Sequence, residues 1–164
     1  FAYLQAHTIL INSARGSVIA EKDLLEDIAK TGRQVVLDVF EHEPLISQQL
    51  LEQISLVTPH IAGYSLEGKA RGTQMIYDAF CQKYNLPVEK DFRTQLPTCE
   101  QFFQYYDLKQ VLADHLVNIY DIAEDDRQLR SCVEDGQVNQ KAFDLLRKNY
   151  PLRREWAAHG GPQA

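Results

Sequence analysis

Short apolar, β-branched runs alternate with amphipathic stretches through the first half of the chain. Residues 8–11 form a short continuous apolar run, typical of a strand buried on both faces. We interpret 34–39 as a second buried strand and 55–57 as a third strand-like run. Between these runs, apolar positions at helical spacing predict helices over about 20–30 and 46–54. The order of strand, helix, strand, short helix and strand predicts a doubly wound parallel sheet.

A long amphipathic helix is predicted next, from about residue 65 to 84. Ser65 is a candidate N-cap, because its hydroxyl can accept a hydrogen bond from a backbone N–H of the first turn. We expect four apolar side chains of this helix to face a core: Ala70, Ile76, Ala79 and Phe80.

The composition changes over residues 85–97, which contain two prolines and mixed charges and which we interpret as a linker. Beyond it, apolar residues at three- and four-residue steps predict helices over about 108–120 and 139–150. We interpret the acidic run at 124–126 as the end of the first of these helices.

Overall composition is that of an ordinary globular protein and narrows the possible partners. The 164 residues include 17 basic and 23 acidic side chains, for a net charge of −6, which argues against nucleic-acid or anionic-membrane partners. No apolar run approaches the roughly 20 residues of a membrane helix. The three cysteines fit neither a metal motif nor a disulfide framework, so we expect a reducing, cytoplasmic setting.

Three ionisable residues each follow a predicted strand: Arg15, Glu43 and His60. The carboxyl ends of parallel strands share one edge of a sheet, where ligands bind. Arginine can clamp a carboxylate, histidine exchanges protons near neutral pH, and a neighbouring glutamate would hold the histidine tautomer and favour its charged form. The trio suits interconversion of a 2-hydroxy and a 2-keto acid with a separate hydride acceptor. From spacing alone, each could equally be a surface or turn residue.

The stretches around these residues resemble the NAD-dependent D-2-hydroxy-acid dehydrogenase family, in its motif order: 12–16 (NSARG), 38–44 (DVFEHEP) and 58–63 (TPHIAG). The stretches 64–73 and 145–156 are similar to a vitamin B6 pathway branch that has an additional dimerisation domain. The resemblance implies an α/β fold, in which the C-terminal part of a doubly wound NAD-binding (Rossmann) domain, 1–86, precedes a smaller α+β dimerisation domain, 87–164.

The resemblance also implies a role for each candidate residue. Arg15 would bind the substrate carboxylate, His60 would be the general acid and base on the C2 oxygen, and Glu43 would orient and charge His60. Tyr64 is expected to contact the substrate, and the positions expected to contact NAD are Ala14, Arg15, Asp38 and Gly63. The implied reaction is oxidation of a small phosphorylated 2-hydroxy acid by a homodimer, with NAD as cofactor.

Parts of the family pattern have no counterpart in this sequence. We find no GxGxxG loop for a pyrophosphate, no acidic residue placed to hold the ribose, and no substrate domain. We therefore expect this chain by itself to bind NAD weakly and to show no turnover. Its histidines lack the helical spacing of a zinc site, so no metal is expected.

Several alternatives stay open at this point. Another acid of the same family, such as 3-phosphoglycerate, could be the substrate, or the protein could be a non-catalytic NAD-sensing co-repressor or an association module. NAD and NADP are not distinguished. A basic cluster is either a solvated helix end or a site for the substrate phosphate: Arg147, Lys148, Arg153 and Arg154.

Overall fold

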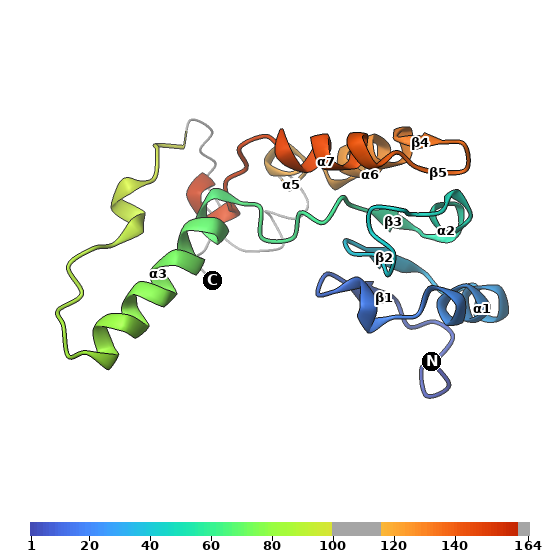
Figure 1. Cartoon of the computed structure of the whole chain (residues 1–164), viewed down its shortest axis with the longest axis horizontal. Helices are drawn as coiled ribbons and strands as arrows, with labels where there is room; N and C mark the ends of the chain where they lie inside the picture. The colour runs from blue at the N-terminus through green and yellow to red at the C-terminus, as the bar shows by residue number, and fades with distance from the viewer. Residues whose placement is uncertain (100–115, 161–164) are drawn as a thin grey trace. The chain divides into compact units, whose positions relative to one another are not determined.

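The computed structural model describes residues 1–99 and 116–160, and its chain forms two compact units (Figure 1). The first unit joins 1–62 to 122–150, and the second joins 63–121 to 151–164. These units differ from the predicted division after residue 86, because the chain returns to the first unit late in the sequence. The helix predicted over 108–120 lies outside the described residues up to 115, and Leu116–Ile119 forms the short helix α5.

The first unit is built on a parallel sheet of three strands in the order β1-β2-β3. The strands are β1 (Leu10–Asn12), β2 (Val35–Leu37) and β3 (Leu56–Val57). Each strand pairs in parallel with the next along the chain. This confirms the predicted α/β arrangement with a parallel sheet.

Two helices connect the strands, as the sequence predicted. They are α1 (Glu21–Thr31) and α2 (Gln48–Gln53), preceded by a turn of 3₁₀ helix, η1 (Gly16–Val18). Gly32 ends α1 in the left-handed conformation that glycine adopts without strain. Between helices and sheet lies a core that includes Leu24, Val35, Leu37, Leu50, Leu51 and Val57.

The prediction that the first strand is buried on both faces was wrong. The side chains of Ile9 and Ile11 are 55% and 67% exposed. Both connections cross in the same direction, from β1 to β2 to β3, so right-handed crossovers place both helices on one face of the sheet. No helix among the described residues of this unit covers the face on which Ile9 and Ile11 lie.

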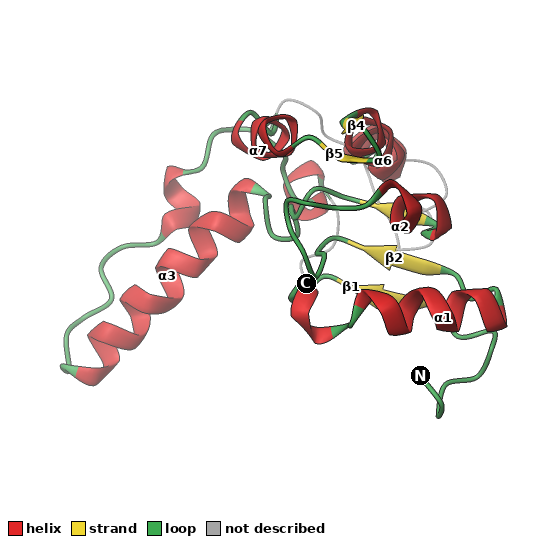
Figure 2. Cartoon of the chain, turned by 45° about the vertical axis from the view of Figure 1, so that its right-hand side comes forward, coloured by secondary structure: helices red, strands yellow, loops and turns green. Residues whose placement is uncertain are grey.

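Residues 122–150 complete the first unit with a helix, a hairpin and a second helix (Figure 2). These elements are α6 (Ile122–Ser131), β4 (Val133–Glu134), β5 (Gln137–Val138) and α7 (Gln140–Lys148). The acidic run 124–126 lies at the start of α6, so the prediction that it ends a helix was wrong. Acidic side chains favour the positive N-terminal end of a helix. The helix predicted over 139–150 is confirmed as α7.

The second unit is organised around one long helix, α3 (Leu66–Lys83), with the predicted N-cap Ser65 accepting a hydrogen bond from the Gly68 N–H. Two 3₁₀ turns accompany it, η2 (Phe92–Gln95) and η4 (Trp156–His159). The prediction that its apolar stripe faces a core was wrong for Ile76 and Phe80, which are 74% and 52% exposed, and for Ala79, which is also exposed. The residues buried on α3 are instead Glu67 and Cys81. Glu67 is buried because residues 153–155 pack on the first turn of the helix. No helix in the described ranges is long and apolar enough to cross a membrane.

Candidate active site

The loops that follow β1 and β2 approach each other closely at Gly16. A Cβ at this position would lie 1.8 Å from the carbonyl oxygen of Phe40, so only glycine fits between the two loops. The Asn12 side chain closes the first loop, since its Nδ2 donates to the Arg15 carbonyl and its Oδ1 accepts from the Ala14 N–H, at 3.0 and 3.1 Å. The sequence analysis did not predict these structural roles of Asn12 and Gly16.

His60 and Glu43 form a hydrogen-bonded pair, as the sequence predicted. The His60 Nδ1 lies 2.8 Å from Glu43 Oε2, and the side chains are 29% and 20% exposed. The other oxygen of Glu43 accepts a hydrogen bond from the Phe40 N–H at 2.8 Å, which fixes the orientation of the carboxylate. A carboxylate at Nδ1 keeps a proton there and leaves Nε2 to exchange a proton with a ligand.

Asp38 anchors the loop that contains His60. It is 6% exposed, and its carboxylate accepts hydrogen bonds from the Thr58 hydroxyl at 2.6 Å and from the backbone N–H groups of Ile61 and Ala62 at 2.8 and 3.0 Å. These three bonds tie the end of β2 to the turn after β3. The buried carboxylate therefore shapes the site, a role that the sequence alone did not suggest.

Arg15 lies at the same edge of the sheet but is not joined to the histidine pair. Its guanidinium donates to the Ala14 carbonyl at 2.7 Å and, within the described part of the chain, has no hydrogen bond or ion pair to Glu43 or His60. Both Ala14 and Arg15 are exposed. An exposed guanidinium at the edge of the sheet where His60 also lies could bind a carboxylate substrate.

The remaining predicted site residues, Gly63 and Tyr64, begin the second unit. Gly63 has a φ of 80°, which favours glycine, and the Lys69 ammonium lies 4.4 Å from the centre of the Tyr64 ring. Contact of Gly63 with NAD and of Tyr64 with the substrate both stay predictions.

Part of the basic cluster is committed to ion pairs and ring contacts. Arg154 donates through Nε to Glu67 Oε1 at 2.6 Å, and its side chain is 13% exposed. Arg153 stacks 4.2 Å from the centre of the Tyr120 ring. Arg154 is therefore not a solvated helix end, and its engagement counts against a role in binding substrate phosphate.

The pKa of Glu67 reflects this pairing. Burial by itself would raise the pKa, but hydrogen bonds from Arg154, from its own backbone and from the Glu155 N–H, with the positive charge of Arg154, hold it below 4.5. The Ser65 hydroxyl donates to Glu155 at 2.9 Å, which joins the N-cap of α3 to the same network.

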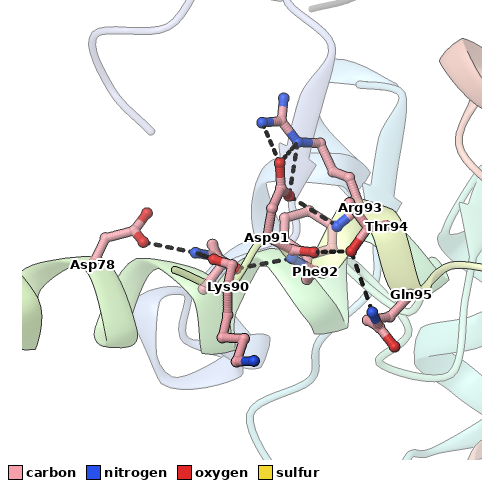
Figure 3. Close-up of polar contacts among 8 residues, drawn as sticks. Asp78, Lys90, Asp91, Phe92, Arg93, Thr94 and Gln95 are labelled. Atoms are coloured by element: carbon pink, nitrogen blue, oxygen red, sulfur yellow. Dashed lines mark hydrogen bonds and ion pairs between the residues drawn. The ribbon is translucent and has the colours of Figure 1, made fainter. Parts of the chain in front are cut away.

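A cavity of about 610 Å³ lies in the second unit, between α3 and residues 88–93. The amide of Gln74 holds its wall, since it donates to Asp78 and to the Lys90 carbonyl and accepts from the Phe92 N–H. Figure 3 shows these polar contacts together with the ion pair of Asp91 and Arg93. The lining mixes acidic and basic side chains and includes none of the predicted site residues.

Comparison with known proteins shows which proteins this chain is similar to. Residues 1–62 match the D-isomer specific 2-hydroxyacid dehydrogenase, NAD binding domain, and residues 100–160 match a domain of unknown function, DUF3410. Over all 164 residues the chain is 71% identical to an erythronate-4-phosphate dehydrogenase of Acinetobacter baylyi and 69% identical to one of Acinetobacter baumannii. The chain is thus similar over its whole length to proteins named erythronate-4-phosphate dehydrogenase, and its first 62 residues match a domain of the D-isomer specific 2-hydroxyacid dehydrogenases. This confirms the family resemblance seen in the sequence.

The chain spans 46% of the length of these Acinetobacter relatives. A more distant erythronate-4-phosphate dehydrogenase, from Psychrobacter arcticus, is 50% identical over 157 residues, which are 41% of its own length. The segment 1–62 that matches the NAD-binding domain contains Arg15, Glu43 and His60, all at the carboxyl edge of the sheet.

Proposed function

We propose that the protein containing this chain oxidises 4-phospho-D-erythronate at C2, with NAD as the hydride acceptor, in the biosynthesis of pyridoxal 5′-phosphate (vitamin B6). The observation that supports this most directly is the pairing of His60 with Glu43 at the carboxyl edge of a parallel sheet. The substrate follows from the names of relatives that are 69–71% identical over the whole chain.

The candidate residues of this chain have separate roles in the proposed reaction. Arg15 binds the substrate carboxylate and polarises the oxygen on C2. His60 takes the proton of the C2 hydroxyl at Nε2 and becomes an imidazolium, while the Glu43 carboxylate stabilises the charge through Nδ1. Bound NAD would supply the acceptor for the hydride that leaves C2 as C2=O forms, and the product would be 3-hydroxy-2-oxo-4-phosphooxybutanoate.

The cofactor would lie along the same edge of the sheet. The exposed loop at Ala14 and Arg15 leaves room for a ligand, and the turn held by Asp38 brings the His60 backbone to the same place. We propose that Ala14, Arg15, Asp38 and Gly63 line the NAD site and that Tyr64 contacts the substrate. The Asp38 oxygens already accept three hydrogen bonds, so Asp38 would act chiefly by holding the loop.

We also propose that the complete protein is a cytoplasmic homodimer that associates through residues 87–164. Sedimentation of the complete protein tests the association, with a dimer expected and a strict monomer contradicting it.

The deciding experiment is an assay of the complete protein for NADH formation from 4-phosphoerythronate, with 3-phosphoglycerate alongside. Preference for 4-phosphoerythronate, together with loss of turnover in H60N, is the expected result. Turnover of 3-phosphoglycerate alone would support the proposed 2-hydroxy-acid oxidation and refute 4-phosphoerythronate as the substrate. Binding of NAD without turnover of either acid would favour a regulatory protein instead.

A further inference from the structure

β3 is an edge strand of the described sheet, and α6 packs against its outer side. An edge strand leaves backbone groups without strand partners. The Val57 N–H is such a group, and it donates to Asp126 Oδ1 at 2.8 Å, across 69 positions of sequence. A side chain of α6 therefore takes the place that a fourth strand would occupy.

Arg130, one turn further along α6, holds Asp126 in this position. Its Nε donates to Asp126 Oδ2 at 2.9 Å. The other two guanidinium nitrogens donate to the carbonyls of Leu51 and Ile54, at the end of α2. One arginine thus caps the helix that leads into β3 and braces the carboxylate that binds β3 itself. The Asp126 and Arg130 side chains are 19% and 31% exposed, so solvent screens this network only in part.

His60 follows Val57 by three residues, and the turn between them is held at both ends. On the inner side, Asp38 accepts hydrogen bonds from Thr58 and Ile61. On the outer side, Asp126 holds Val57. The turn has little freedom of its own, because the His60 N–H donates to the Thr58 carbonyl and its φ is 55°. A shift of β3 would accordingly move the imidazole relative to Glu43.

We propose that Asp126 and Arg130 are positioning residues for His60. They hold β3 in the position that lets the imidazole contact both Glu43 and the substrate. This inference rests on the proposed function, since it assigns these residues to the same proton transfer. It gives part of the second matched segment, 100–160, a role in the chemistry of residues 1–62.

The proposal predicts a specific kinetic signature. A displacement of about 1 Å in a reacting group can lower the rate up to roughly 100-fold. We expect D126A in the complete protein to lower kcat by roughly 10- to 100-fold, while the KM for NAD stays unchanged. D126N should recover only part of the activity, because its amide oxygen can still accept from the Val57 N–H but its N–H₂ group cannot accept from Arg130 Nε.

E124Q is the matched control on the same helix. Glu124 pairs with Arg127 on the exposed side of α6, where the two side chains are 48% and 62% exposed. The E124Q substitution should leave kcat unchanged. A cycle that combines D126A with E43Q should give less than the product of the two separate losses, because both changes act through His60.

Two further measurements keep the proposal testable whatever the variants do. If D126A does not fold, R130K replaces it, since lysine keeps the charge but cannot reach the carboxylate and both carbonyls together. Amide hydrogen exchange of residues 55–62 should accelerate in D126A or R130K and not in E124Q. If the unsubstituted protein is inactive but its variants show these differences in exchange, the proposed function is refuted and the bracing of β3 by Asp126 and Arg130 is not. Equal kcat in E124Q and in folded D126A or R130K, or a loss of kcat that is larger in D126N than in D126A, would overturn the positioning role.

Discussion

Replacing Glu43 with glutamine tests the contact on which the proposed chemistry depends. The Glu43 carboxylate bridges the Phe40 N–H and the His60 Nδ1, both at 2.8 Å. In E43Q the amide oxygen must face the Phe40 N–H, since the opposite orientation would set two donors against each other. The amide N–H₂ then donates to Nδ1, so the neutral imidazole keeps its proton on Nε2. His60 must then give up this hydrogen bond and carry its proton on Nδ1 before Nε2 can accept the proton of the substrate hydroxyl.

The size of the loss follows from the lost charge-assisted hydrogen bond. Both side chains are less than one-third exposed, at 29% and 20%, so solvent weakens the bond only moderately. Such a bond contributes about 1.5–3 kcal/mol. Since each 1.36 kcal/mol changes a rate about tenfold, kcat should fall by roughly 10- to 150-fold.

The assay is steady-state NADH formation from 4-phosphoerythronate by the complete protein, with the KM for NAD expected to stay unchanged. E52Q is the control, because Glu52 is an exposed residue of α2 whose side chain, in the described part of the chain, bonds only to the Gln48 side chain. A kcat for E43Q equal to that of E52Q would refute the argument that Glu43 acts on His60. A rise in the KM for 4-phosphoerythronate with an unchanged kcat would show that Glu43 binds substrate instead.

Three other predictions concern stability and reactivity. The pKa of Glu67 is lowered in the folded state, so its contribution to stability is complete above pH 4.5 and is lost as the pH falls through the pKa of the folded state. Urea unfolding at stepwise pH should show this loss, and R154Q should abolish it. Burial raises the pKa of the Cys132 thiol, so iodoacetamide should alkylate it more slowly in the folded protein than in urea, and equal rates would contradict this. G16A should destabilise the fold by about 3 kcal/mol or more in thermal unfolding, because its Cβ would overlap the Phe40 carbonyl; an unchanged Tm would refute that close approach.

The order of helices and strands from β1 to α3 could be predicted because its signals are local. β-Branched runs, the cap at Gly32 and the N-cap at Ser65 each depend on residues a few positions apart. Which faces are covered depends on distant residues instead. The exposure of Ile11 and Ile76 follows from which elements pack beside them, and periodicity reports only that one face is apolar.

The candidate site shows the same division. The pairing of Glu43 with His60 could be predicted because both follow strands whose carboxyl ends meet at one edge. The anchoring role of Asp38 could not, because it depends on backbone N–H groups 23 and 24 positions away, and backbone groups leave no mark in a sequence. The hydrogen bond from Val57 to Asp126 spans 69 positions and was equally hidden.

The position of His60 is therefore a property of more than the segment that contains it. The segment matched to the NAD-binding domain ends at residue 62, and in that segment β3 has a strand partner only on the side of β2. Its outer side is occupied by α6, from the segment matched to a domain of unknown function. An uncovered edge would expose the Val57 N–H to water and leave the turn at His60 held by Asp38 alone. Since the proposed proton transfer needs the imidazole within hydrogen-bond distance of both Glu43 and the substrate, covering that edge serves the chemistry as well as the stability of the sheet.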